Sequence, residues 1–386
     1  MKKRVSILGA TGSVGQQALD VVRSRGYGVD LLSANRDVAA MEAAAREFQP
    51  RIVAMADEAA AGELKVRLSD TDIRVYSGED GLISAIYETD ADTVINSILG
   101  GAGLRPTLAT IDAGKRLALA NKESLVIAGD TVMSRAKEKG VEIIPVDSEH
   151  SAIFQSLKSG KGSEIQSIIL TASGGPFYGY SRERLAEVTL ADTLAHPTWK
   201  MGKKITVDSA TLMNKGFELI EAVHLFSLSP EQVRVTIHRE SILHSAVEYI
   251  DNTVIGELSV PDMRMCVQYA VDYPERAPSQ SKRLDLISLG SLTFAEPDMD
   301  AFPLLGLASR AISLGGAMPA VMNAADEVAV SAFLEGKIGF TDISDTVISA
   351  FERLSDYKDT RDLDGILAAD KEAREITDKL IKFGGK

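Results

Sequence analysis

The chain has 386 residues, a formal net charge of −13, and ordinary shares of hydrophobic (45%) and charged (25%) residues. This length allows two or three domains, each with its own core. An acidic chain without a long basic run argues against nucleic acid or an anionic membrane as a partner. The single cysteine, Cys266, excludes an internal disulfide and fits a reducing compartment, so we expect a cytoplasmic protein.

The N-terminal sequence MKKRVSILGATGSVG has a basic start followed by a short apolar run. That run is too short for a signal peptide and continues into a glycine-rich turn, so it predicts a first β-strand. No apolar segment of the chain reaches the roughly 18 residues that a membrane-spanning helix needs.

Residues 1–150 alternate strand-like runs with helical stretches, such as 38–48 and 123–140. Strands are predicted at 5–8, 29–33, 51–55, 73–77, 93–98, 116–120 and 141–146. This alternation predicts an α/β fold with an N-terminal Rossmann-like, doubly wound parallel sheet.

The rest of the chain has a different pattern. Residues 151–290 predict a central α+β domain with a smaller antiparallel or mixed sheet, its strands at 167–173, 233–240, 246–250 and 253–260. Stretches rich in proline and charge follow, and we place a linker at 291–302. Residues 303–386 have helical spacing, with Pro319 in the first turn of one helix and Gly336 at its stop, and predict a C-terminal helical bundle.

The sequence GATGSVG follows the first strand and opens the first helix. Gly9 permits a tight turn, Gly12 lets the backbone approach a pyrophosphate, and Gly15 lets the helix pack closely. A plain strand-to-helix turn is the alternative, but the strand–turn–helix context favours a nucleotide. After the second strand, Arg36 favours NADP because it can pair with a 2′-phosphate. Arg36 as a solvated surface residue and Asp37 as a helix cap are the alternatives.

LANKES, at 119–124, ends another predicted strand, where α/β sheets bind their ligands. Asn121, Lys122 and Glu123 offer an amide, a cation and an acid in a row. A charged helix start, with Glu123 favoured by the helix dipole, is an equal alternative.

In PVDSEHSAIFQ, at 145–155, two carboxylates flank Ser148. Asp147 or Ser148 could cap a helix. In an extended segment, however, Asp147 and Glu149 would project from one side and converge on a hard cation such as Mg²⁺ or Mn²⁺. Two ligands are too few for a site, so a third is needed.

The best place to look for a third ligand is the block HPTWKMGKKITVDSATLMNKGFELIEA, at 196–222. Ser209, Asn214 and Lys215 have the hydroxyl, amide and ammonium groups of a phosphate cradle. On a helix, Asn214, Lys215 and Glu218 share one face, although a simple Lys215–Glu218 salt bridge would give the same pattern. Pro-Trp-Lys-Met-Gly, with Trp199 and Met201, is typical of a mobile lid.

LTASGGPF, at 170–177, ends a strand with small residues. The backbone of Ser173-Gly174-Gly175 could approach an anion, and an ordinary Gly-Gly turn is an equal alternative. For four of the five histidines the spacing favours no role beyond a structural one: His150, His224, His238 and His244.

The chain closely resembles the 1-deoxy-D-xylulose 5-phosphate reductoisomerase family over its whole length, through GATGSVG, ANKES, PVDSEHSAIFQ, LTASGGPF, HPTWKMGKKITVDSATLMNKGFELIEA and MPAVMNAADEVAVSAF in this order. The resemblance implies a homodimeric, NADPH-dependent enzyme that needs Mg²⁺, Mn²⁺ or Co²⁺ and acts in the non-mevalonate isoprenoid pathway. It would rearrange and reduce 1-deoxy-D-xylulose 5-phosphate to 2-C-methyl-D-erythritol 4-phosphate. Residues 1–150 would bind NADPH, and residues 151–290 would carry catalysis and dimerisation.

The resemblance also implies the site residues. The metal ligands would be Asp147, Glu149 and Glu218, with Lys122 near the reacting end. The substrate would contact both of those glutamates and Ser148, Ser173, His196, Ser209, Asn214 and Lys215. NADPH would contact Lys122 and Thr11, Gly12, Ser13, Val14, Asn35, Arg36, Asn121, Glu123 and Gly202. Two stretches depart from the family pattern: Asn35-Arg36-Asp37, where many members have Gly-Lys-Asn, and His238-Arg239-Glu240, where His-Pro-Gln is frequent.

Two other classes of protein compete with this hypothesis. An NADP-dependent semialdehyde dehydrogenase shares the GxTGxxG turn, but it needs a nucleophilic cysteine on an exposed turn, and Cys266 lies in a helix-like apolar segment. An inert NADP-sensing or scaffold protein would have no use for three separated carboxylates and a phosphate cradle.

Overall fold

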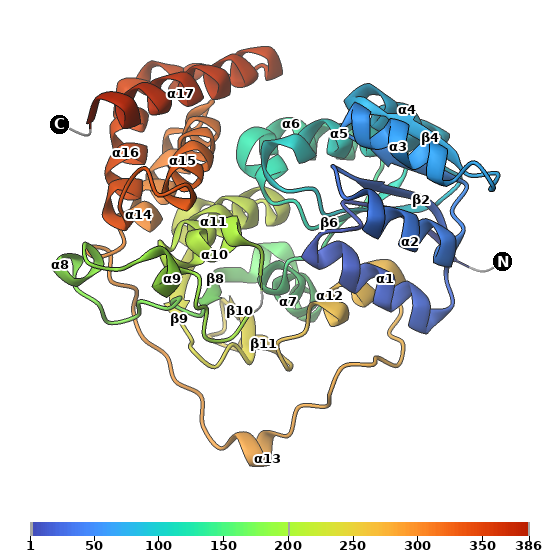
Figure 1. The fold of residues 1–386 in the computed structure, drawn as a ribbon. Helices are drawn as coiled ribbons and strands as arrows, with labels where there is room; N and C mark the ends of the chain where they lie inside the picture. The colour runs from blue at the N-terminus through green and yellow to red at the C-terminus, as the bar shows by residue number, and fades with distance from the viewer. Residues whose placement is uncertain (1–2, 200, 385–386) are drawn as a thin grey trace. The chain divides into compact units, whose positions relative to one another are not determined.

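The computed structural model describes residues 3–199 and 201–384 (Figure 1). Contacts divide the chain into two units, each assembled from separate stretches. The first unit comprises the residues up to Ser124, then Val132–Ser151 and Asp262–Lys282. The second comprises Leu125–Thr131, Ala152–Pro261 and the residues from Arg283 onward. This division differs from the predicted boundaries, because 262–282 joins the first unit and the C-terminal helices join the central segment.

The first unit contains a parallel sheet of seven strands. They are β1 (Arg4–Leu8), β2 (Gly28–Ala34), β3 (Ile52–Met55), β4 (Arg74–Ser77), β5 (Thr93–Asn96), β6 (Arg116–Leu119) and β7 (Ile143–Pro145). Their order is β4-β3-β2-β1-β5-β6-β7, and every neighbouring pair is parallel. The predicted doubly wound sheet is therefore confirmed, and the strand order reverses between β1 and β5.

Helices connect these strands: α1 (Ser13–Arg25), α2 (Val38–Phe48), α3 (Glu58–Arg67), α4 (Gly78–Glu88), the 3-10 turn η1 (Gly100–Gly103) and α5 (Leu104–Asp112). The unit also contains α12 (Met263–Asp272), which comes much later in the chain. Two more, α6 (Glu123–Lys139) and α7 (Ser148–Ser156), contribute residues to both units. The helix predicted at 38–48 is found with the same bounds, whereas α6 is interrupted at Ala128, which has non-helical backbone angles.

The core of this unit lies between the sheet and its helices. Strands β3 and β5 are buried along their whole length, as expected for parallel strands covered on both faces. One core cluster joins residues from four strands to α4 and α5: Leu8, Leu31, Ile52, Ala54, Leu82, Ala85, Ile86, Val94 and Ala109.

Helix α12 is held to the first unit by polar contacts at its end, which explains its place there. The Lys3 ammonium donates to the carbonyl oxygen of Val271 at 2.6 Å, and the Tyr27 hydroxyl donates to the Asp272 carboxylate. Arg116, at the start of β6, donates to the carbonyl oxygen of Tyr273 at 3.0 Å. None of these long-range contacts leaves a local pattern in the sequence.

The second unit contains a mixed sheet of four strands: β8 (Ile165–Ala172), β9 (Val233–Ile237), β10 (Leu243–Tyr249) and β11 (Val254–Leu258). Their order is β11-β10-β8-β9, with β8 and β9 parallel and the other pairs antiparallel. This confirms the smaller mixed sheet predicted for the central segment, and it leaves β11 at one edge.

The other elements of this unit are mostly helical. They are η2 (Leu157–Ser159), η3 (Gly162–Glu164), α8 (Arg182–Leu185), α9 (Leu190–Thr193), α10 (Lys203–Ala210), α11 (Met213–Phe226), η4 (Pro230–Gln232), α13 (Leu286–Leu289), α14 (Pro303–Leu314), α15 (Met318–Leu334), α16 (Phe340–Arg353), η5 (Ser355–Asp359) and α17 (Leu363–Gly384). Helices α14 to α17 confirm the predicted helical tail, with Pro319 in the first turn of α15. Residues 283–302 run as an extended arm that carries α13 (Figure 1). Among the described helices, none is both long and apolar enough to cross a bilayer.

A buried carboxylate fastens β2 to the neighbouring connections of the first unit. Asp30 is 1% exposed and accepts hydrogen bonds from Arg51 at 3.2 Å, the Thr89 hydroxyl at 2.7 Å and the Asp90 backbone N–H at 2.8 Å. Burial alone would raise the pKa of Asp30, but these donors and the Arg51 charge lower it below the ordinary value. The folded state therefore favours the ionised carboxylate.

We expect Asp30→Asn to lower the free energy of unfolding at neutral pH by about 1–3 kcal/mol, because buried donors lose a charged acceptor. Since the folded-state pKa is depressed, this contribution is present above the unfolded-state pKa and is lost as pH falls below about 4. Urea unfolding at several pH values should show the difference between wild type and variant narrowing in acid. Asp20→Asn, at an exposed carboxylate, is the control, and a pH-independent difference for Asp30→Asn would contradict the prediction.

Candidate active site

The glycine-rich turn lies at the reversal point of the large sheet, where open α/β sheets bind their ligands. Gly9 has a φ of +80°, and a Cβ atom there would lie 2.8 Å from the carbonyl oxygen of Ser97, just after β5. A Cβ atom on Gly15 would lie 2.2 Å from the carbonyl oxygen of Gly9. Both positions therefore need glycine, as predicted from the sequence.

The N-terminus of α1 suits a phosphate group. Its cap residue, Gly12, has no side chain to cover the first N–H groups of the helix, which carry the positive end of the helix dipole. Thr11, Gly12, Ser13 and Val14 are all at least partly exposed here. The geometry fits the pyrophosphate of a dinucleotide, so these residues stay predicted cofactor contacts.

The residues after β2 are exposed, as an adenosine site requires. The Arg36 side chain is 78% exposed and its Nε donates to the Asp57 carboxylate at 2.9 Å. Asp37 accepts from the Ala40 N–H at 3.0 Å, so the capping alternative for Asp37 is confirmed. Asn35 and Arg36 are thus accessible, and a 2′-phosphate bound at Arg36 would have to share the Arg36 guanidinium with the Asp57 carboxylate.

Asn121 is buried and its side chain serves a loop of the protein itself. Its Nδ2 donates to the carbonyl oxygens of Ile98 and Gly100 at 2.8 and 2.9 Å, and to the Glu123 carboxylate at 2.9 Å. A Cβ atom on Gly103 would lie 2.3 Å from the Asn121 side chain, so this glycine makes room for it. Asn121 therefore fastens the segment after β5 to the start of α6, which begins at Glu123 as its charge at a helix N-terminus predicts.

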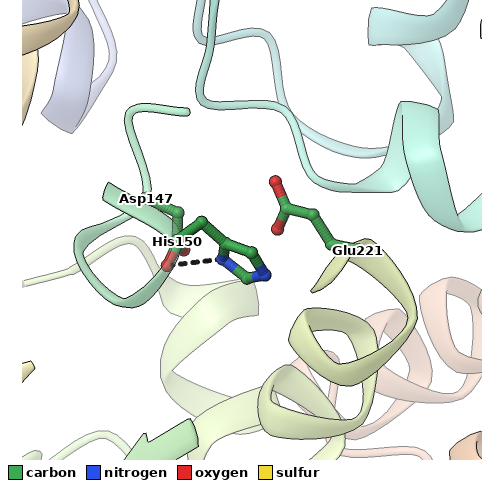
Figure 2. A group of neighbouring side chains, drawn as sticks. All are labelled: Asp147, His150 and Glu221. Carbon is green, nitrogen blue, oxygen red and sulfur yellow. Dashed lines mark hydrogen bonds and ion pairs between the residues drawn. The ribbon is translucent and has the colours of Figure 1, made fainter. Parts of the chain in front are cut away.

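Asp147 follows β7 and lies between the basic side chains of Lys122 and His150, of which Figure 2 shows His150. The Lys122 ammonium donates to one carboxylate oxygen at 2.8 Å, and His150 Nδ1 lies 3.2 Å from the other. Burial alone would raise the pKa of Asp147, but the charge of Lys122 and the contacts with His150 hold it well below its ordinary value. The structure thus keeps Asp147 ionised, which is the state a cation needs.

The sequence argument that placed Asp147 and Glu149 on an extended segment is wrong. Helix α7 begins at Ser148, and Asp147 caps it by accepting the Glu149 N–H at 3.2 Å, so the capping alternative is confirmed. The two carboxylates still offer oxygen atoms within 4.8 Å of each other, because a cap residue lies close to the first turn of its helix. Ser148 Oγ donates to Glu149 at 2.6 Å. This oxygen-rich pair fits a hard cation.

In the second unit, Ser173, His196 and Ser209 come together. The His196 Nε2 lies 3.2 Å from both serine hydroxyls, while its Nδ1 accepts the backbone N–H groups of Thr198 and Trp199 at 3.2 and 3.0 Å. Because Nδ1 is an acceptor, Nε2 carries the proton of the neutral ring. Burial and the nearby Arg239 lower the pKa of His196, which favours this neutral form. The three side chains form a compact group of hydroxyl and imidazole donors.

Helix α11 supplies a second group. It begins directly after Leu212, a non-glycine residue with a φ of 59°, so the turn from α10 is tight. Asn214 and Lys215 both donate to the Glu218 carboxylate, as their spacing predicts. The salt-bridge alternative is thus also present in the structure. Glu218 is 1% exposed, so a charge at this depth depends on its partners.

The predicted lid contains Lys200, which lies outside the described residues. Beside it, the Trp199 ring lies 6.2 Å from the ring of His244 on β10. Burial lowers the pKa of His244 to about 4, so this imidazole is neutral at physiological pH. Gly202 caps the N-terminus of α10 and is exposed.

Two residues without an assigned role in the sequence also carry groups that bind cations. His150 is fully buried against Asp147, and Glu221 is fully buried one turn after Glu218 on α11 (Figure 2). Each lies three residues from a predicted metal ligand, and that helical spacing is the signal that could have found them. Each unit thus has acidic groups of its own: Asp147 and Glu149 in the first, and Glu218 and Glu221 in the second.

A doubly wound sheet with a glycine turn at its reversal point, in one chain with buried carboxylates and a group of hydroxyl, imidazole and ammonium side chains, is typical of a dinucleotide-dependent oxidoreductase that uses a divalent cation. The family model of 1-deoxy-D-xylulose 5-phosphate reductoisomerase matches residues 5–129. The family model of the 1-deoxy-D-xylulose 5-phosphate reductoisomerase C-terminal domain matches residues 143–226, and that of the DXP reductoisomerase C-terminal domain matches residues 258–376. The chain belongs to the 1-deoxy-D-xylulose 5-phosphate reductoisomerase family, so the resemblance found in the sequence is confirmed.

Individual relatives agree over the whole chain. The 1-deoxy-D-xylulose 5-phosphate reductoisomerase of Acetivibrio thermocellus is 50% identical over 382 residues, which cover 99% of this chain and 100% of the relative. That of Caldanaerobacter subterraneus subsp. tengcongensis is 50% identical over 376 residues, covering 97% and 98%.

Solved structures show the same fold. A crystal structure of DOX-P reductoisomerase in complex with NADPH, fosmidomycin and magnesium matches with a TM-score of 0.94 and 40% identity, covering 98% of each chain. The enzyme from Zymomonas mobilis in complex with NADPH matches with a TM-score of 0.91 and 40% identity, covering 99% of this chain and 100% of that one.

We expect Gly9→Ala to weaken NADPH binding by about tenfold or more, because the new methyl group would push the turn away from β5. Fluorescence titration with NADPH measures the effect. Gly114→Ala is a matched control, since Gly114 also has a positive φ, +67°, but no atom lies within 4 Å of a Cβ atom built there. Equal losses of affinity in both variants would show that backbone strain, and not the close approach to Ser97, is responsible.

Proposed function

We propose that the protein converts 1-deoxy-D-xylulose 5-phosphate to 2-C-methyl-D-erythritol 4-phosphate with NADPH and a divalent cation, in the non-mevalonate isoprenoid pathway. The observation that carries this proposal is similarity over the full chain to enzymes of that name at about half identity. A related structure in complex with NADPH, fosmidomycin and magnesium supports the cofactor and the cation. The semialdehyde dehydrogenase alternative is not favoured, because Cys266 lies within α12 and not on an exposed turn.

Asp147, Glu149 and Glu218 would hold the cation, for which Mg²⁺, Mn²⁺ and Co²⁺ are the candidates. The donor set is all carboxylate oxygen, which suits these ions, and the ionised Asp147 is ready to bind. A divalent cation held by these residues would supply Lewis acidity to oxygen atoms of the substrate. Lys122, which donates a hydrogen bond to Asp147, would hold a proton near the reacting end.

The substrate phosphate would be bound by groups of the second unit. Ser173, His196 and Ser209 already converge, and Asn214 and Lys215 lie on the next helix. These contacts supply binding energy remote from the reacting carbons. Ser148, between the two acids of the first unit, would contact the other end of the sugar. Closure of the segment around Trp199 and Met201 would exclude water.

NADPH would lie along the carboxyl edge of the large sheet. The residues that would bind it are Thr11, Gly12, Ser13, Val14, Asn35, Arg36, Asn121, Lys122, Glu123 and Gly202. Asn121 uses its side-chain nitrogen to hold neighbouring residues, so it would act on the cofactor by fixing the shape of the loop.

The predicted division of the chain would hold for its functional segments. These are residues 1–150, residues 151–290, a linker at 291–302, and residues 303–386.

We expect Glu218→Gln to reduce metal-dependent turnover by about a hundredfold or more, because a carboxylate ligand becomes a weak neutral one. NADPH oxidation is followed at the reduced-nicotinamide absorbance band with Mg²⁺ and 1-deoxy-D-xylulose 5-phosphate, while NADPH binding stays intact. Glu231→Gln, at an exposed glutamate, is the control. Near-normal turnover of Glu218→Gln would remove this residue from the ligand set, and no turnover by the wild type would refute the enzyme function.

The active form would be a homodimer in the cytoplasm. The edge strand β11 supports this, because Val254 and Leu258 expose 51% and 39% of their surface beside open backbone groups. An exposed apolar edge strand is a site where a second copy can add its own strand or pack its own apolar surface. Ile250, just before it, is 63% exposed and extends the apolar surface.

We expect sedimentation velocity to show a dimer for the wild type and a monomer for Val254→Lys, because a charge on the apolar edge opposes association. Val66→Lys is a matched control, since Val66 is 74% exposed on α3 and is expected to leave the dimer intact. A monomeric wild type would refute the dimer, and a dimeric Val254→Lys would refute this contact surface.

A further inference from the structure

One charged cluster of the second unit has no part in the function described above. The Lys204 ammonium, in the first turn of α10, donates to the Asp208 carboxylate at 2.7 Å and to the Asp326 carboxylate on α15 at 2.8 Å. The side chains of Asp208 and Asp326 are 3% and 0% exposed, whereas that of Lys204 is 24% exposed. The cluster therefore joins two helices whose sequence positions are more than a hundred residues apart.

Lys204 also contacts a third helix. Its ammonium lies 4.8 Å from the centre of the Phe217 ring on α11, and Phe217 is fully buried directly before Glu218. One cation thus holds α10, α11 and α15 through two ion pairs and an aromatic face.

Burying the charged groups of this cluster costs free energy of folding. Two buried carboxylates lie beside the same ammonium, and a lysine in the first turn of a helix is opposed by the helix dipole. Burial raises the pKa of Asp326 although the charge of Lys204 lowers it. Buried ion pairs contribute little net stability but restrict the geometry in which side chains meet. A cluster of this kind therefore suits a part of the protein whose orientation matters.

Helix α10 is such a part. Ser209 follows Asp208 directly, and its hydroxyl lies 3.2 Å from His196. A Cβ atom on Gly175 would lie 2.7 Å from the carbonyl oxygen of Ser209, so the turn that begins at Ser173 packs against the end of the same helix. Any rotation of α10 about its axis would move Ser209 and disturb the whole group of Ser173, His196 and Ser209.

We propose that Lys204, Asp208 and Asp326 are positioning residues that lock the rotation of α10 against α15, so that the C-terminal helices align Ser209 and His196 for the substrate phosphate. The inference rests on the proposed function of these groups as the phosphate site. It gives the helical tail a role in substrate affinity, although none of its residues has been assigned to the substrate, the cofactor or the metal.

The test is Asp326→Ala, assayed in the full-length protein with saturating NADPH and Mg²⁺. We expect KM for 1-deoxy-D-xylulose 5-phosphate to rise by about tenfold or more, since small misplacements of binding groups have effects of this size. The inhibition constant of inorganic phosphate should rise by a similar factor, while kcat and KM for NADPH change by less than about twofold. Asp326→Asn keeps the shape but loses the charge, and should give an intermediate rise in KM of about threefold.

The matched control is Lys337→Met, which removes an exposed ion pair with Glu335 just beyond the end of α15 and should leave every parameter unchanged. If Asp326→Ala fails to fold, Asp326→Asn serves as the test. It should likewise raise KM for the sugar phosphate while leaving KM for NADPH nearly unchanged. Unchanged KM and phosphate inhibition in a folded Asp326 variant would overturn the proposal. Equal changes in both KM values would also overturn it, because they indicate general loosening. Wild-type protein without any turnover would instead refute the function on which the inference rests.

Discussion

Parallel strand pairing is the constraint on which the first unit depends. Because all seven strands run the same way, all their carboxyl ends meet at one edge of the sheet. That edge receives the glycine turn after β1, the exposed Asn35 and Arg36 after β2, the Asn121–Glu123 turn after β6, and Asp147 after β7. Residues far apart in the chain reach one place without any local signal linking them. Open α/β sheets bind dinucleotides where the strand order reverses, which here is between β1 and β5 at the same edge.

Both units handle buried charge in a similar way. Lys122 pairs with Asp147 in the first unit, and Lys215 pairs with Glu218 in the second, so one proposed ligand in each unit lies beside a cation of the protein. An acidic chain with a net charge of −13 can therefore still recognise an anionic sugar phosphate, because recognition depends on the local groups and not on the net charge. The same lysines lie beside the proposed metal ligands, so they already balance part of the negative charge of these carboxylates before a cation binds.

The strands and most helices could be predicted because each has a clear apolar period and a turn residue at its end, as for β1 and the helix at 38–48. The i,i+3 and i,i+4 contacts of Glu218 followed from helical geometry alone. The extended segment at 147–149 was wrong, because a cap residue and an extended residue have the same sequence signature. The pairing of Lys204 with Asp326, and of α12 with the first unit, depends on side chains that meet only in three dimensions. No pattern in one sequence could predict them.

The discontinuous composition of the units has a consequence for how the protein is made. The first unit needs α12, and α12 comes after more than a hundred residues that belong to the second unit. During synthesis the large sheet can therefore form early, but Asp272 reaches Tyr27 only after most of the chain has left the ribosome. A fragment that stops at residue 150 would expose the face of α1 that α12 covers. Cutting the gene at the end of the sheet would thus produce an aggregation-prone fragment, whereas joining residues 262–282 to it by a short linker would restore the missing cover.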